Sequence, residues 1–220
     1  MQTALAQTVP FLREFPVVRP DADTIPMGVT QMFDKEEEIF AEGDRATCFY
    51  KVVSGAIRTS KLLSDGRRQI DAFHLAGDFF GIEVGREHRF SAEALGRATV
   101  IAYRRTALDA LGNGRGEFSR QIIASMMHSL ERAQAHMMLL GRKTALERIA
   151  TFLLDLAERL DDDHLDMMMS RIDIADHLGL TIETVSRTLT QLERKGIIEV
   201  VGHRRTIVLQ DKDALRNLDS

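Results

Sequence analysis

The sequence has few of the features that mark secreted, membrane or cysteine-ligated metal proteins. Its 220 residues include one cysteine, Cys48, and no tryptophan. An intrachain disulfide and a site built from several cysteines are therefore excluded. No signal sequence and no long apolar run lie near its start. We expect a soluble, cytoplasmic protein that makes no contact with a membrane.

The charge balance excludes a chain that is basic overall, but it allows a local basic patch. The formal net charge is −4, with 28% of residues charged and 44% hydrophobic. This composition is typical of a globular protein with enough chain for two modest cores. Between residues 186 and 205, five arginines and lysines against two glutamates leave a local charge of +3. Such a patch is enough for a nucleic-acid site.

The first half of the sequence divides into an arm and a β-rich domain. Residues 1–25 hold three of the four prolines and no sustained period, which predicts an N-terminal arm. Residues 26–114 contain short β-rich runs with glycines 11 or 12 residues apart, at Gly43, Gly55, Gly66 and Gly77. This spacing predicts an antiparallel β-roll or sandwich, with two strands joined at Gly55.

The apolar pattern of residues 115–141 predicts one long helix. Apolar side chains recur every three or four residues over about seven turns. Such a seam can seal against the β-roll or pair with a copy of itself as in a coiled coil, and the methionines beside it favour both. The residues expected at a homodimer interface are Phe118, Ile122, Met126, Ser129, Ala133, Met137 and Leu140.

Residues 142–220 predict a winged helix-turn-helix domain, which makes the whole fold α+β. Thr144 and Glu147 fit a capping box that starts one helix, and Ser170 is placed to cap the next. Gly179 breaks that helix before Thr181, which is placed to cap a longer one. The runs IIEVV and TIVLQ then predict two strands around a basic tip.

The helix that follows Thr181 has an apolar face and a polar face. The apolar stripe consists of Ile182, Val185, Leu189 and Leu192. On the polar face, Arg187 can donate to O6 and N7 of guanine, Glu183 can accept from the amine of cytosine, and Ser186 can serve either strand. One good bidentate contact supplies about 1–3 kcal/mol of discrimination. The alternative is an exposed Glu183–Arg187 ion pair worth about 0.3–0.5 kcal/mol.

The caps, the turn and the basic wing favour the first interpretation, in which this polar face binds double-stranded DNA, over the exposed ion pair. Groups suited to phosphates surround the polar face, and they would supply affinity and register but no sequence preference. These expected phosphate contacts are Arg171, Thr181, Thr184, His203, Arg204 and Arg205.

The order of β-roll, long helix and winged helix-turn-helix resembles the CRP/FNR family of bacterial transcription regulators. The run TIETVSR carries the Glu-x-x-Ser-Arg pattern of its FNR and FixK branches, and GDFFGIE and HRFSAEAL are most similar to FixK-type regulators. The resemblance covers nearly everything from Ile39 to Gln210. It implies a homodimer that binds TTGAT-N4-ATCAA-like palindromes and mainly activates transcription, with RNA polymerase as partner, in a low-oxygen or nitrogen-oxide circuit.

The β-roll departs from the pattern of family members that bind cyclic nucleotides. An isoleucine separates Gly81 from Glu83, a phenylalanine separates Arg89 from Ser91, and Ala133 stands where the long helix should carry a hydroxyl. A phosphate buried without matched donors binds poorly. We expect no cyclic nucleotide and activity without a small effector. Arg89 should instead pair with a carboxylate, the candidates being Glu83, Glu87 and Glu93.

Other cofactors and activities have weak support in the sequence. The arm has no cysteines for an iron–sulfur cluster, and Cys48 is expected to be a half-buried apolar residue, with a redox role as the alternative. No metal site or cofactor is expected. No catalytic motif indicates an enzyme. The remaining alternative is a ligand-dependent regulator whose β-roll or dimer interface binds a metabolite or a haem, the latter through His128 and His136.

Overall fold

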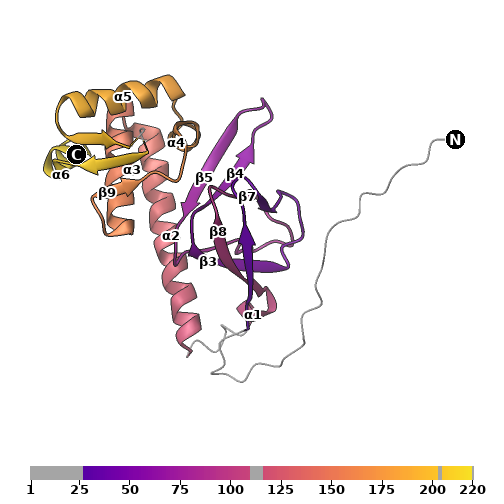
Figure 1. Cartoon of the computed structure of the whole chain (residues 1–220). Coiled ribbons are helices and arrows are strands. Elements are labelled where there is room, and N and C mark those ends of the chain that lie inside the picture. The colour runs from indigo at the N-terminus through magenta and orange to yellow at the C-terminus, as the bar shows by residue number, and fades with distance from the viewer. Residues whose placement is uncertain (1–26, 110–115, 203–204, 220) are drawn as a thin grey trace.

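The computed structural model describes residues 27–109, 116–202 and 205–219. It shows a β-rich domain linked by one long helix to a helical domain (Figure 1). The predicted arm at 1–25 and two predicted phosphate contacts, His203 and Arg204, lie outside the described residues. Among the helices that the structure describes, none is long and apolar enough to cross a membrane.

Two four-stranded sheets form the β-roll. One sheet has the order β1-β8-β3-β6, formed by Val29–Phe33, Ala98–Arg104, Cys48–Ser54 and Phe79–Phe80. The other has the order β2-β7-β4-β5, formed by Glu38–Phe40, Ser91–Ala94, Ile57–Leu62 and Arg68–His74. The strands within each sheet pair antiparallel, which confirms the predicted fold of this domain.

The chain passes from one sheet to the other at Gly55. Strands β3 and β4 meet there, as predicted, but they belong to different sheets. Gly55 has a φ of +80°, and a Cβ at this position would lie 2.6 Å from the carbonyl oxygen of Arg97. Only glycine tolerates both the conformation and the close approach. The two sheets can therefore close over a core that includes Val52, Ile57 and Val100.

The long helix α2, Glu117–Arg142, follows the short helix α1, Thr106–Asp109, and its first turns seal the β-roll. Phe118 is 8% exposed and Ile122 is 0% exposed, and they pack with Phe49, Phe79 and Tyr103. The prediction that Phe118 and Ile122 contact a partner subunit is therefore wrong. Their side chains are already buried inside their own subunit.

The C-terminal domain contains the predicted helix-turn-helix and wing. Its helices are α3 Ala145–Leu160, α4 Arg171–Leu178, α5 Ile182–Arg194 and α6 Lys212–Asp219. Its sheet has the order β10-β11-β9, formed by Ile198–Val201, Thr206–Leu209 and His164–Asp166. The sequence predicted the two strands of the wing. The third strand and the final helix are additions from the structure.

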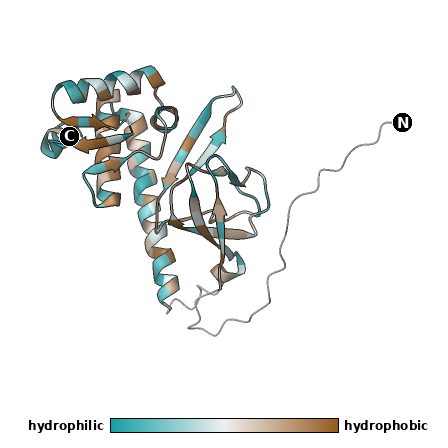
Figure 2. Ribbon diagram, viewed as in Figure 1, coloured by the Kyte–Doolittle hydropathy of each residue, from teal (hydrophilic) through white to brown (hydrophobic). Residues whose placement is uncertain are grey.

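The core of the C-terminal domain continues into the β-roll. Leu153, Leu178 and Leu192 of this domain belong to the same buried cluster as Ile70 and Phe73 of β5. Figure 2 shows apolar residues on the strands and helices that face one another, with hydrophilic residues along the outer helices. The two modest cores expected from the composition are thus joined at this boundary, because β5 contributes to both domains.

Candidate nucleic-acid interface

Local sequence signals position α5 as predicted. The Ser170 side chain and the Asp173 side chain form a reciprocal capping box at the start of α4. Gly179 ends α4 in the left-handed region, with a φ of +62°. The Thr181 hydroxyl then accepts a hydrogen bond from the Thr184 backbone N–H at 3.2 Å, which caps α5. These three signals give the turn its geometry.

The inner face of α5 holds it against the domain core. Val185 and Leu192 are 0% exposed, and Leu189 is also buried. Ile182, predicted to lie on this face, is exposed at the first turn. The helix is thus anchored by its middle and end, which leaves the N-terminal turns accessible along the outer edge of the domain (Figure 1).

The three predicted base-reading residues lie on the outer side of α5. Glu183 and Arg187 are exposed, and Ser186 is half-buried. Within the described part of the chain, neither the Glu183 nor the Arg187 side chain forms a hydrogen bond or an ion pair. The i,i+4 ion pair considered as the alternative is therefore not formed. These side chains can meet an external partner without breaking an internal contact.

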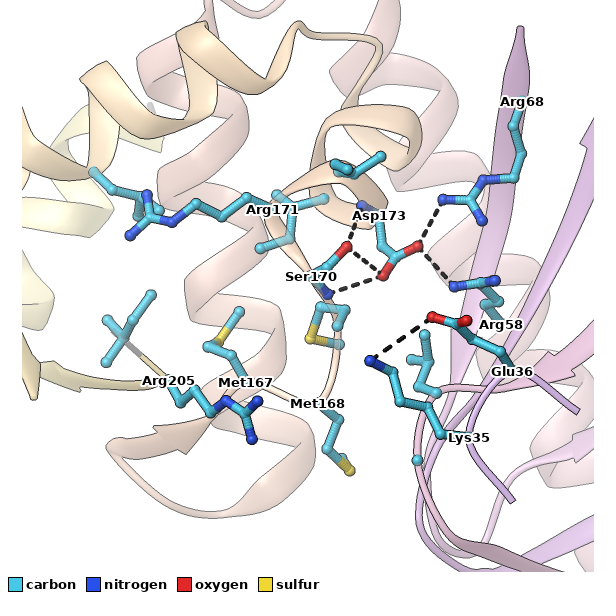
Figure 3. A pocket seen from close by; sticks show the side chains of 17 residues that line it. Lys35, Glu36, Arg58, Arg68, Met167, Met168, Ser170, Arg171, Asp173 and Arg205 are labelled. Carbon is cyan, nitrogen blue, oxygen red and sulfur yellow. Dashed lines mark hydrogen bonds and ion pairs between the residues drawn. The ribbon is translucent and has the colours of Figure 1, made fainter. Parts of the chain in front are cut away.

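The predicted phosphate-binding residues that the structure describes surround this helix unevenly. Thr181 and Thr184 lie at its N-terminus, with their hydroxyls 3.0 Å apart. Arg171, at the start of α4, and Arg205, at the base of the wing, line a cleft of about 740 Å³ between the C-terminal domain and the β-roll (Figure 3). Two of the described phosphate candidates therefore lie at the cap of α5, and the other two line the cleft beside the β-roll.

The structure also reveals a charged cluster that the sequence did not predict. Asp173 accepts hydrogen bonds from Arg58 Nη1 at 2.9 Å and from Arg68 Nη2 at 2.7 Å, and both arginines come from the β-roll (Figure 3). Burial raises the pKa of Asp173, but hydrogen bonds from Ser170 and the charges of the two arginines outweigh it, so the pKa is lowered. The only sequence signal was the cap at Ser170. The arginines lie 105 and 115 residues away.

An internal ion pair lies where the resemblance to the CRP/FNR family would place a nucleotide cradle. Glu83 Oε2 lies 3.1 Å from Arg89 Nε, and the Glu83 side chain also accepts from the backbone N–H of Arg89. This confirms the predicted pairing and selects Glu83 among its three candidates. Glu93 pairs instead with Arg58. An anion entering this cavity would meet a buried carboxylate already bound to the arginine.

The structure gives Cys48 and His136 packing roles, while His128 is exposed beside Glu131. Cys48 begins β3 half-buried, as predicted, and burial raises the pKa of its thiol despite the nearby Thr47 and Arg104. His136 stacks on His177 at 4.1 Å and its Nε2 lies 2.9 Å from the His177 carbonyl oxygen. No group of three or more metal-ligating side chains occurs among the described residues.

The exposed apolar stripe of α2 differs from the predicted seam. Of the predicted interface residues, Met137 belongs to this stripe and Met126 and Ala133 lie beside it, while Ser129 and Leu140 face their own subunit. The stripe shows a spacing of four and three residues in alternation and consists of Ile123, Met127, Leu130, Gln134, Met137 and Gly141. Its four large apolar members are each at least 48% exposed.

Comparison with known proteins gives a consistent family assignment. Residues 147–218 match the Crp-like helix-turn-helix domain, and residues 30–114 match the cyclic nucleotide-binding domain. The nitrogen fixation regulation protein FixK of Azorhizobium caulinodans is 47% identical over 92% of this chain and 84% of that protein. FixK of Rhizobium meliloti is 45% identical, with 82% of each chain covered. The chain belongs to the CRP/FNR family.

Within the CRP/FNR family, the chain is a FixK-type, DNA-binding transcription regulator. The solved structure of FixK2 from Bradyrhizobium japonicum matches it with a TM-score of 0.82 at 47% identity, covering 88% of this chain and 98% of that one. A CooA mutant from Carboxydothermus hydrogenoformans matches with a TM-score of 0.73 at 24% identity, which supports the fold alone. The predicted family and fold are confirmed.

Proposed function

We propose that this CRP/FNR-family regulator binds TTGAT-N4-ATCAA-like palindromes as a homodimer and mainly activates transcription together with RNA polymerase. The observation that carries the proposal is the outward position of Glu183 and Arg187 near the capped start of α5, where neither side chain has a partner among the described residues. A recognition helix presents its N-terminal residues to base edges in the major groove. In this assignment Arg187 reads the guanine, Glu183 reads the opposite strand beside it, and Ser186 contacts an outer thymine pair.

The exposed stripe of α2 supports the homodimer. Alternating intervals of four and three residues form the seam of a two-stranded coiled coil. Gln134 places one polar group within that seam, a feature that fixes the register of paired helices. Palindromic operators reflect the two-fold symmetry of such dimers. The partner we propose for this stripe is therefore a second copy of the same chain.

The Arg89–Glu83 pair supports activity without a small effector. Binding a cyclic phosphate would require separating this pair and leaving Glu83, 7% exposed, next to the incoming negative charge. Unmatched buried charge is costly. We place the regulator in a low-oxygen or nitrogen-oxide circuit, as its resemblance to FixK-type regulators implies, and two relatives at 45–47% identity are nitrogen fixation regulation proteins.

Selection of duplexes from a random pool tests the proposal. Purified protein without added ligand should enrich TTGAT-type palindromes under both reducing and oxidising conditions. Absence of enrichment over scrambled duplex in both conditions would overturn sequence-specific binding by the unliganded protein. Enrichment limited to the reducing condition would assign control to Cys48, and a Cys48→Ser variant should then bind in both.

One further cavity favours the ligand-dependent alternative. It measures about 350 Å³ and lies where β5, α2, α3 and α4 meet, with Phe73, Phe152, His136 and His177 among its lining residues. Apolar cavities at domain junctions are common ligand sites. In that case the enrichment should appear only after a small molecule or haem is added.

A further inference from the structure

The helix-turn-helix is tied to the β-roll by carboxylates at the start of α4. The Asp173 carboxylate forms ion pairs with Arg58 and Arg68. Arg68 also donates a hydrogen bond through Nε to Asp176 Oδ2 at 2.8 Å. The Asp173 side chain is 5% exposed and that of Arg58 is 9% exposed. This Asp173 cluster, comprising Arg58, Arg68, Asp173 and Asp176, joins strands β4 and β5 to the C-terminal domain, and Figure 3 shows its first three members.

The Asp173 carboxylate takes part both in the cap of α4 and in the contact with the β-roll. Its Oδ2 accepts from the Ser170 backbone N–H at 2.9 Å and from the Ser170 hydroxyl at 2.7 Å, which completes the cap of α4. Its Oδ1 accepts from the two arginines of the β-roll. Because one oxygen serves the cap and the other the cross-domain contact, a tilt of α4 disturbs both.

The other end of α4 is also fixed to β5. Nδ1 of His177 lies 3.2 Å from the carbonyl oxygen of Ile70, and Gln69 Nε2 donates to the carbonyl oxygen of His177 at 3.3 Å. Since α4 is held at both ends, and α5 follows it after the short turn at Gly179, the direction of α5 is set by the β-roll. The roll in turn is sealed to α2 by Phe118 and Ile122.

Fixed geometry matters for a dimer that reads two half-sites. Half-sites of such dimers lie about one helical turn apart, so one added base pair moves the second site by about 3.4 Å and rotates it by about 35°. A dimer with rigidly held recognition helices should bind such a site weakly, whereas a dimer with loosely held helices can adjust to it. A buried ion pair forms only in a specific geometry and adds little net stability. Such a pair is therefore suited to fixing the orientation of one domain relative to another.

We propose that the Asp173 cluster sets the distance and angle between the two recognition helices of the dimer, and thereby the spacer that the protein accepts between half-sites. The inference rests on the proposed function, since it requires a dimer on a palindrome. Asp173 and Arg68 are positioning residues in this account. They touch no base and act through the placement of α5.

The test measures binding to duplexes whose two TTGAT half-sites are separated by three, four or five base pairs, and to a duplex with one half-site. The full-length protein should bind the four-base-pair spacer at least about tenfold tighter than the other two. In Asp173→Asn and Arg68→Gln this ratio should fall to about threefold or less. Affinity for the single half-site should stay within about twofold, because the base contacts are intact.

Two matched variants separate alignment from general damage. Arg67→Gln removes a neighbouring, exposed arginine whose side-chain ion pair is with Asp65, and it should keep the wild-type ratio. Arg68→Lys keeps the charge and should restore part of the preference lost in Arg68→Gln. Arg68 is partly exposed, so its variants test the inference even if Asp173→Asn unfolds.

The outcomes distinguish this inference from the proposed function. A folded Arg68→Gln protein with the wild-type spacer ratio would overturn the role of the cluster and leave the proposed function standing. A wild-type protein with no preference for TTGAT half-sites over scrambled DNA would overturn both. A loss of single-half-site binding equal to the loss on the palindrome would show that the cluster supports only the fold of the domain.

Discussion

At the scale of single residues, Arg187 differs from the arginines of the Asp173 cluster. Arg58 and Arg68 are bound to Asp173. Arg187 has no such partner within the described residues, and its guanidinium is exposed. A guanidinium without an internal partner loses only water when it meets guanine, so more of the contact energy remains available for discrimination.

Replacing Arg187 with alanine should therefore reduce specificity more than it reduces general binding. We expect Arg187→Ala to lose about 1–3 kcal/mol on a TTGAT palindrome and to bind duplexes changed at the guanine as well as the cognate one. Arg194→Ala, an exposed arginine at the other end of α5, is the matched control and should affect cognate and scrambled DNA alike. Fluorescence anisotropy at fixed salt measures both. Equal losses for Arg187→Ala on the two duplexes would contradict the assignment.

Residue contacts could be predicted from the sequence only where they are local. The period of α5 sufficed to place Glu183, Ser186 and Arg187 outside, and the Arg89–Glu83 pair spans six residues. The partners of Asp173 could not be found this way. They arrive from strands more than a hundred residues earlier, through the packing of two domains.

At the scale of elements, α2 has two apolar faces with the same helical spacing, one packed on the β-roll and one exposed. Its apolar residues recur at helical spacing on both sides, and the sequence alone did not separate the side that seals the roll from the exposed side. Phe118 and Ile122 face the roll because the aromatic residues Phe79 and Tyr103 lie opposite them. The helix was thus predicted correctly, while the exposed apolar stripe lies one residue away from the predicted seam.

The corrected stripe leads to a prediction about assembly. Leu130→Glu should place a charge in the middle of the proposed coiled-coil seam and convert the dimer to monomers, because an ionised side chain in an apolar contact is costly. Ala124→Glu, on an exposed part of the same helix about a quarter-turn away, should leave the dimer intact. Sedimentation velocity distinguishes the two states. A dimeric Leu130→Glu protein would mean that another surface holds the subunits together.

At the scale of the whole molecule, buried histidines couple stability to pH. Desolvation is the largest cause that lowers the pKa of His74 to about 4 and that of His177 to about 3, and the charges of His136 and Arg159 contribute to the shift of His177. The unfolded chain binds protons at these residues near pH 6.5. Between about pH 4 and 6.5 the unfolded state therefore holds more protons than the folded one, and stability falls as the pH falls.

We expect the free energy of unfolding to be lower at pH 5 than at pH 7.5, by on the order of 1–2 kcal/mol for each of these histidines. His177→Asn keeps an N–H donor near the carbonyl of Ile70 but cannot titrate, so it should show a smaller loss. Asp173 has a lowered pKa, and its contribution is lost only below about pH 4. Urea titrations at both pH values provide the measurement. An unchanged pH dependence in His177→Asn would contradict this account.

The order of domains was predictable because each has its own local signals: glycine spacing for the roll, a long apolar period for α2, and caps and a turn for the helix-turn-helix. The way the domains join was not predictable. It depends on Ile70 and Phe73, which lie on either side of a register shift in β5 and are buried under helices from the far end of the chain.

This shared burial has a consequence for protein engineering. A fusion that transplants residues 142–220 onto another sensor would leave behind Ile70 and Phe73, together with Arg58 and Arg68, and would expose the surface they cover on α4. The C-terminal domain therefore cannot be moved to another protein without the β-roll surface that it packs against. A working chimaera should carry the β4–β5 hairpin along with it, so that the graft includes the surface on which the helices rest.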